Sequence, residues 1–266
     1  MIRKTSNWKS LKTLRQLLFL GFLLILWELV ARIGNLPSLL FPPFSSVLSS
    51  FTTQIINREL LNRTLFSLYL IGIGLGIALV SALVITALTV CFSFFSEWIQ
   101  VLMAIMHPLP GIAILPVIIL WLGTGPQSII AVIIISAVWP VIANLSIGLR
   151  SIPITQIEVG KNLGLNRLKL TWFILLPGAF PYILSGLRIA WARAWQAAVA
   201  AEMVFGASGG EGGLGWFIYK KRFFLETADV FAGMIVIVLI GFIVERLGFE
   251  WIENRTVRLW GMTTHT

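Results

Sequence analysis

The sequence contains few charged residues, a single cysteine and two histidines. Only 12% of its 266 residues are charged, whereas roughly 25% is usual for a soluble domain. This scarcity of charge, together with 58% apolar residues and a mean hydropathy of +0.92, excludes a water-soluble globular protein. Cys91 has no second cysteine for an internal disulfide, and so few thiols and imidazoles argue against a structural zinc site. We therefore expect neither redox chemistry nor a bound metal.

The sequence contains long runs without a charged residue. The 33 residues between Arg63 and Glu97 and the 52 residues between Glu97 and Arg150 include no Asp, Glu, Lys or Arg. A bilayer core of about 30 Å needs about 20 helical residues at about 1.5 Å each. The sequence therefore predicts an all-α polytopic membrane protein with a single membrane domain over residues 1–266. Its six expected spans cover about 14–33, 64–91, 97–121, 127–149, 177–202 and 229–250.

Basic residues favour one orientation of these spans. An N-terminus in the cytoplasm places twelve of the twenty basic residues inside and six outside, as the positive-inside rule requires. The basic start also resembles a signal peptide, but Trp27 and Glu28 stand where small residues would be needed for cleavage, so we keep 14–33 as a span. The net charge of +9 is explained by these basic inner loops, and we expect membrane lipid and no nucleic acid as a partner.

The cytoplasmic loop 150–176 carries the clearest local signals. Thr155 and Glu158 form a capping-box pattern, which predicts a helix over Gln156–Leu163. Gly164 is suited to end that helix in a left-handed conformation. Because a helix of this length, about 12 Å, is unstable alone in water, it requires a partner surface. On these local signals alone, a connecting loop with a capped turn is the preferred interpretation.

A longer pattern favours a specific role for this loop. The segment EVGKNLG, nine residues and then ILLP resembles the cytoplasmic signature of permease subunits of binding-protein-dependent ABC importers. The matching residues are Glu158, Gly164, Ile174, Leu176 and Pro177, while Val159 and Gly160 replace two alanines of the family pattern. Over most of the chain, the sequence resembles the nitrate, sulfonate, taurine and bicarbonate branch of these importers. Pro177 is expected to be the first residue of the fifth span.

The resemblance implies a type I (MetI-like) ABC importer architecture in a bacterial inner membrane. It also implies two permease copies, two cytoplasmic ATPase subunits that hold ATP and Mg²⁺, and an external binding protein that delivers the solute. The solute would be a small oxyanion or sulfonate, and this chain would itself have neither a cofactor nor enzymatic activity. The residues expected to dock on the ATPase are Thr155, Glu158, Val159, Gly160, Leu163, Gly164, Leu176 and Pro177.

Polar residues within the spans are candidates for the translocation pathway. Arg188 and Arg193 lie at hydrocarbon depth, where a buried arginine must face protein or water. They are about 140° apart around the helix, so at most one faces a central pathway. We expect a structural role for Arg188, either in hydrogen bonds to helix-end carbonyls or in an ion pair with a carboxylate such as Glu202 or Glu28. Arg193, with the neighbouring Trp195 and Gln196, is the candidate for guiding an anion, and Asn144 is a further candidate.

Other polar and glycine-rich features have competing interpretations. Glu202 either fixes the outer loop or lines the outer gate, and we favour the first; His107 is interpreted as a satisfied core histidine. Glycines 72, 74 and 76 lie within a span, where they favour close helix packing over nucleotide binding. The loop Gly206–Gly215 lacks the Lys-Ser or Lys-Thr of a phosphate loop, so it is interpreted as an outer gate or a contact for the binding protein.

Two other classes of function were weighed against an ABC permease. An ion-coupled transporter or channel would need intramembrane carboxylates, and the second, third and fourth spans contain none. A membrane-embedded enzyme would need a carboxylate pair, a metal cluster or an activated nucleophile, and the sequence offers no such pattern. The ion-coupled transporter therefore remains the alternative to the permease.

Overall fold

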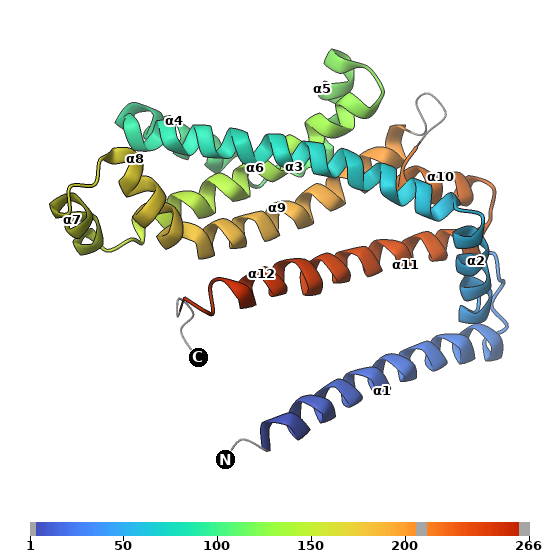
Figure 1. Ribbon diagram of the computed structural model, residues 1–266. Helices are drawn as coiled ribbons and strands as arrows, with labels where there is room; N and C mark the ends of the chain where they lie inside the picture. Colours follow the sequence, from blue (N-terminus) through green and yellow to red (C-terminus); the bar gives the residue numbers. More distant parts are fainter. Residues whose placement is uncertain (1–3, 206–211, 261–266) are drawn as a thin grey trace. The chain divides into compact units, whose positions relative to one another are not determined.

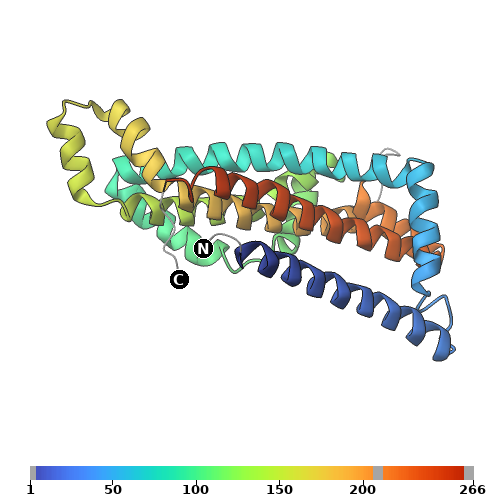
Figure 2. The same cartoon turned by 60° about the horizontal axis from the view of Figure 1, so that its bottom comes forward.

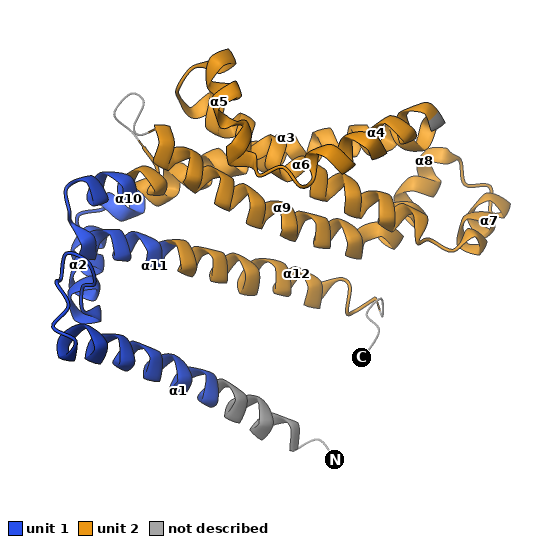
Figure 3. Ribbon diagram, turned by 180° about the vertical axis from the view of Figure 1, so that it is seen from behind, with its two compact units in different colours: residues 1–62, 217–236 blue, residues 63–216, 237–266 orange. Residues whose placement is uncertain are grey.

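The computed structural model describes residues 4–205 and 212–260, with side chains from Leu14 onward except that of Ser93. Every regular element in these ranges is a helix, as predicted. The chain divides into two compact units (Figure 3): unit 1 is residues 1–62 with 217–236, and unit 2 is residues 63–216 with 237–266. Within the described residues, five helices are long and apolar enough to span a membrane, or six if one bent pair counts as a span.

Unit 1 contains α1 (Lys4–Ile33), α2 (Phe44–Ile56) and most of α10 (Leu214–Phe223) and α11 (Thr227–Ile243). Trp27 of α1 contacts the rings of Phe41, Phe44 and Phe231, with ring centroids 5.4–5.9 Å apart. Its indole also donates a hydrogen bond to the carbonyl of Pro42, at 3.1 Å. This aromatic cluster attaches α1 to the segment before α2 and to α11.

Unit 2 is built around α6 (Pro126–Arg150) and α9 (Leu176–Phe205), which run side by side in Figures 1 and 2. Small residues allow the two backbones to approach closely. A Cβ built at Gly148 would lie 2.8 Å from Tyr182 Cβ, and one at Gly186 would lie 2.9 Å from Asn144 Cβ. Gly74 of α3 (Glu59–Cys91) similarly approaches Ile133 of α6, which confirms its packing role. A Cβ at Gly72 or Gly76 would meet no atom of the described residues within 4 Å, so close packing was the wrong interpretation for these two glycines.

The third span differs from the prediction of one helix over 97–121. The structure has α4 (Ser93–Met106) and α5 (Gly111–Leu122), and the two helices are bent by 103° relative to one another. Pro108 and Pro110 lie in the break, where neither can donate a backbone hydrogen bond. The two proline rings therefore interrupt the helical hydrogen bonds, although no charged residue interrupts the segment after Glu97.

π-Helical turns connect α-helices at two places in the chain, and the spacing of apolar residues did not predict them. α8 (Arg167–Leu170) leads through η1 (Thr171–Leu175) into α9, so the helical path begins ahead of Pro177, which is the second residue of α9 and not the first of the span. After α11, η2 (Val244–Phe249) leads into α12 (Glu250–Arg255). A small apolar core formed by Leu184, Phe249 and Val257 packs this C-terminal path against α9.

Candidate functional site

The helix predicted in the loop 150–176 is present as α7 (Ile154–Asn162), but it begins differently. Pro153 is the residue that caps it, and no side chain makes a capping hydrogen bond, so the predicted Thr155 capping box is wrong. The ring of Pro153 fixes φ at −59°, and its carbonyl accepts the Gln156 amide at 3.0 Å. The helix therefore starts before Thr155, which lies within the first turn, where its hydroxyl cannot act as the cap.

The end of α7 is the one predicted. Gly164 has a φ of +75°, and its amide donates to the carbonyl of Lys161 at 2.9 Å. The amide of Leu165 donates to the carbonyl of Gly160 at 3.1 Å, which completes a Schellman motif. This pair of bonds fixes the direction in which the chain leaves α7 toward α8.

Gly160 brings the two halves of the signature, EVGKNLG and ILLP, into contact. It is the buried residue of α7, and a Cβ built there would lie 2.4 Å from Ile174 Cδ1 and 2.7 Å from Leu170 Cδ1. The glycine that replaces the family's alanine thus allows α7 to pack tightly on the path that leads into α9. A movement of α7 would be passed directly to Ile174 and so to the start of α9.

The surface around α7 is apolar and exposed. Thr155, Gln156 and Val159 face residues 173, 174, 177 and 178 across a cavity of about 430 Å³. Glu158 and Gly164 are exposed, and Leu176 and Pro177 are half-buried. The apolar side chains that remain more than half exposed in this region are Ile154, Val159, Leu163, Leu168, Trp172 and Phe173. Leu168, Trp172 and Phe173 lie in the stretch 167–205, which is long and apolar enough to span a membrane, whereas Ile154, Val159 and Leu163 lie on or beside α7, outside the candidate spans. Exposed apolar groups outside the spans are typical of an interaction surface.

The two intramembrane arginines have different partners. Arg188 Nη2 bonds Glu253 Oε2 at 2.9 Å, its Nε lies 3.1 Å from Glu245 Oε1, and its guanidinium lies over the ring of Phe249. A structural ion pair was predicted, but Glu28 and Glu202 were the wrong partners, because η2 and α12 bring other carboxylates to this face of α9. Arg193 instead donates to the carbonyl of His107, at 3.1 Å.

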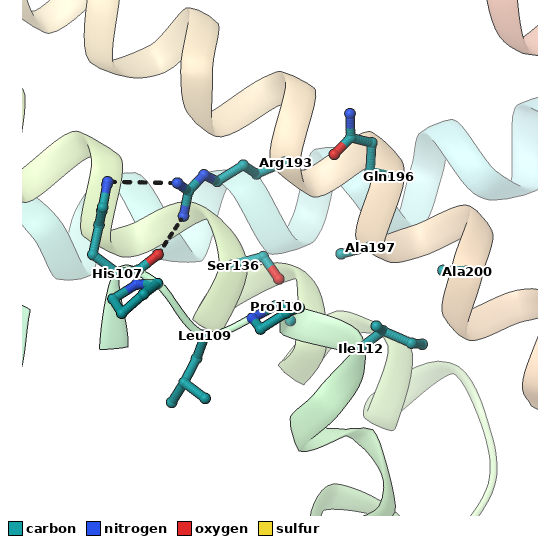
Figure 4. A pocket seen from close by; sticks show the side chains of 11 residues that line it. His107, Leu109, Pro110, Ile112, Ser136, Arg193, Gln196, Ala197 and Ala200 are labelled. Carbon is teal, nitrogen blue, oxygen red and sulfur yellow. Dashed lines mark hydrogen bonds between the residues drawn. The ribbon is translucent and has the colours of Figure 1, made fainter. Parts of the chain in front are cut away.

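Arg193 lines a cavity of about 400 Å³ at the break between α4 and α5 (Figure 4). Gln196, one turn further along α9, lines the same cavity, as do Ser136 of α6 and the segment from His107 to Ile112. His107 is exposed, so its interpretation as a core histidine was wrong: the prolines that follow it turn the chain out of the helix. The sequence did not identify Ser136 or the break after His107 as parts of this cavity, because only the bend between α4 and α5 brings them to Arg193.

The other two pathway candidates lie elsewhere. Trp195 is buried and stacks on Trp191, with ring centroids 5.9 Å apart, and it is not one of the residues that line the cavity. Asn144 donates to the carbonyl of Pro140 at 2.9 Å and packs against Gly186. Both side chains belong to the packing of α6 and α9 in this structure.

Glu202 forms a buried cluster with the segment that begins α10. Ser67 Oγ lies 2.8 and 2.9 Å from the two carboxylate oxygens, and the amide of Gly215 donates to Oε2 at 2.8 Å. The amide of Leu214 donates in turn to Ser67 Oγ at 2.8 Å. A Cβ at Gly213 would lie 2.1 Å from Glu202 Oε1, which explains a glycine there. This geometry agrees with the interpretation of Glu202 as fixing the outer loop, although residues 206–211 of that loop lie outside the described residues.

Comparisons with known proteins agree with these observations. Residues 74–258 match the family described as binding-protein-dependent transport system inner membrane component. The chain is 30% identical over 251 residues to the taurine transport system permease protein TauC of Escherichia coli, covering 89% of this chain and 86% of that protein. It is 28% identical over 243 residues to the nitrate import permease protein NrtB of Synechocystis sp., covering 89% and 87%.

A solved structure shows the same fold. The inward-facing MetNI methionine ABC transporter matches with a TM-score of 0.59 at 17% identity, over 74% of this chain and 96% of that one. The expected type I architecture is therefore confirmed, together with the resemblance that the signature of the cytoplasmic loop suggested. The chain belongs to the family of inner-membrane permease components of binding-protein-dependent ABC transport systems.

Proposed function

We propose that this chain forms the translocation pathway of an ATP-driven importer and that α7 is its contact with a separate ATPase subunit. The observation that carries the proposal is the packing of Gly160 on Ile174, which connects the exposed helix α7 to the start of α9. An ATPase that closes around ATP and Mg²⁺ would displace α7, and the rigid Schellman end would pass that displacement into the membrane helices.

The orientation that this requires has the N-terminus and α7 in the cytoplasm. The excess of basic residues on that side supports it. The opposite side then carries the segment fixed by Glu202, where an external binding protein would deliver the solute. ATP hydrolysis belongs to the partner subunits in this scheme, and two copies of the permease enclose the pathway.

A small oxyanion or sulfonate is the proposed solute class. Relatives named for taurine and nitrate transport support it, and so does the cationic cavity at Arg193. Taurine carries a sulfonate group and nitrate is a planar oxyanion, so both present oxygens of one negative charge to hydrogen-bond donors.

Co-purification and transport test the proposal together. The permease, expressed with the ATPase and binding protein encoded beside it, should be recovered with the ATPase in stoichiometric amounts. In proteoliposomes, uptake of the binding protein's solute should require ATP and should survive a protonophore. Uptake that needs an ion gradient and proceeds without ATP would instead establish the ion-coupled transporter.

A further inference from the structure

The cavity at the break between α4 and α5 has an unusual balance of charge. Its lining contains one charged side chain, Arg193, and no carboxylate. The remaining side chains that line it with polar atoms are His107, Ser136 and Gln196. Proline, leucine, isoleucine and alanine residues complete the wall. An uncompensated cation in a mostly apolar wall attracts an anion more strongly than the same cation would in water.

Among the described residues, Arg193 differs from Arg188 in having no carboxylate that neutralises its charge. Arg188 lies beside two carboxylates, which neutralise it. Arg193 donates to the neutral carbonyl of His107, and its Nη2 lies 3.5 Å from His107 Nε2. Neither contact cancels the charge, and a guanidinium has five N–H donors in a planar fork, so donors remain for a second acceptor.

The polar neighbours select for a small acceptor. Arg193 and Gln196 both line the cavity from α9, and in Figure 4 the guanidinium extends toward His107 while the amide of Gln196 projects from the same helix in another direction. The hydroxyl of Ser136 already donates to the carbonyl of Val132 at 2.7 Å, so it has no proton left to offer a ligand. Arg193 is therefore the one cationic hydrogen-bond donor among the described residues that line the cavity. A ligand with a single negative charge is favoured, because a second negative charge on the ligand would be desolvated without a cationic partner.

The volume sets an upper size for the ligand. About 400 Å³ is near the lower end of small-molecule sites, so a compact anion would fill only part of the cavity and share it with water. Gly111 is required for this space: a Cβ there would lie 1.8 Å from Ser136 Oγ. Any larger residue at position 111 would force Ser136 or the start of α5 to move.

From these contacts we infer that the cavity is a binding site for a compact monovalent oxyanion, such as nitrate or a small sulfonate. The Arg193 guanidinium binds the anion's oxygens, and the Gln196 amide orients them. Arg193 keeps its bond to the His107 carbonyl and binds the anion through its remaining N–H groups. This inference rests on the proposed function, because it places a solute contact within the transport pathway, but it makes a separate claim about which residues bind.

Equilibrium binding to the purified permease–ATPase complex tests the site without knowledge of the natural solute. Thermal stability would be followed during titration with sodium nitrate, sodium methanesulfonate and sodium sulfate, with ionic strength held constant by sodium gluconate. Nitrate and methanesulfonate should stabilise the complex saturably, as ligands of the native state do, and more tightly than sulfate. Absence of saturable binding, or tighter binding of sulfate, would overturn the inference.

Variants then assign the binding to named side chains. Arg193→Gln should weaken nitrate binding by about tenfold or more, and Arg193→Lys by about threefold, because lysine keeps the charge and loses the fork. Gln196→Leu leaves the His107 contact intact and should weaken binding by about fivefold, which keeps the test independent of any effect of Arg193 on folding. Arg246→Gln is the matched control, since Arg246 pairs with Glu250 and does not line the cavity.

The outcome is separable from that of the proposed function. ATP-driven uptake by the same preparation reports the importer, whereas the variant titrations report the cavity. An active importer whose nitrate affinity is unchanged by Arg193→Gln and Gln196→Leu would refute the site alone. Loss of affinity in both variants, with the Arg246→Gln control unchanged, is the result expected.

Discussion

Ile174 packs directly on Gly160, so that a Cβ at residue 160 would lie 2.4 Å from Ile174 Cδ1. These two residues belong to the two separate parts of the cytoplasmic signature, one on α7 and one in η1. Their contact gives the signature a physical meaning, because the spacing between its parts is the length of chain needed to turn at Gly164 and return to α7.

Enlarging residue 160 should uncouple ATP hydrolysis from transport. Gly160→Val would displace Ile174 and Leu170, and we expect uptake per ATP hydrolysed to fall severalfold, by roughly five times, as overpacking shifts α7. Gly160→Ala is the matched control: its methyl group meets only the ends of two flexible side chains, and alanine favours the helix by about 1 kcal/mol. Measured uptake and ATPase rates in proteoliposomes decide it, and normal coupling in the valine variant would contradict the contact's role.

The left-handed residue that ends α7 should be equally sensitive. Gly164→Pro cannot adopt a φ of +75° and lacks the amide that donates to Lys161, so we expect ATP-driven uptake to be lost. Gly72→Ala serves as the control, because a Cβ at Gly72 meets no atom within 4 Å. Uptake measured in proteoliposomes that contain ATP and receive the binding protein from outside compares the two. If the proline variant transports normally, the direction of the chain after α7 is irrelevant to coupling.

Ser67 and Glu202 should be energetically coupled, although 135 residues separate them. Removing either partner leaves a buried donor or acceptor unsatisfied, at a cost of about 1–3 kcal/mol. Ser67→Ala, Glu202→Gln and the double variant should therefore give a coupling energy of about 1 kcal/mol or more from unfolding in detergent. Additive effects of the two substitutions would show that the hydrogen bonds contribute nothing specific to the cluster.

Arg188 should affect stability and leave solute affinity unchanged. Arg188→Gln removes the partner of Glu245 and Glu253, and its half-buried position suggests a loss of roughly 1–3 kcal/mol. The melting temperature of the complex should fall while the KM for solute stays the same. A raised KM with an unaltered melting temperature would place Arg188 in the pathway and remove the distinction from Arg193.

Lys221 should stabilise unit 1 across the neutral range of pH. Burial disfavours its charged form, but hydrogen bonds and charge from Asp229 and Glu226 outweigh burial and raise the pKa of Lys221 above its ordinary value of 10.5. A raised pKa means that the stabilisation is fully present below that value and is lost only as the pH rises above it. Lys221→Met should thus lower the melting temperature equally from about pH 7 to about pH 9. A difference that vanishes within this range would contradict the ion pair.

The sequence was sufficient for the helical class and the Schellman end at Gly164, because these depend on local composition and on one glycine. It did not predict the break between α4 and α5 after His107, where two prolines end a helix that the apolar pattern alone would continue. It also could not identify the carboxylates that pair with Arg188, or Ser67 as the partner of Glu202. Those pairings join helices far apart in the chain, and no local pattern encodes them.

The side of the membrane on which α7 lies tests the account most directly. Val159 is more than half exposed on α7, so Val159→Cys in a Cys91→Ser background provides one accessible thiol, and Thr124→Cys, at the exposed turn between α5 and α6, is the opposite control. A membrane-impermeant maleimide should label residue 159 in inside-out vesicles alone and residue 124 in right-side-out vesicles alone. Labelling of residue 159 from outside the cell would place α7 beyond the reach of any cytoplasmic ATPase and would contradict the account.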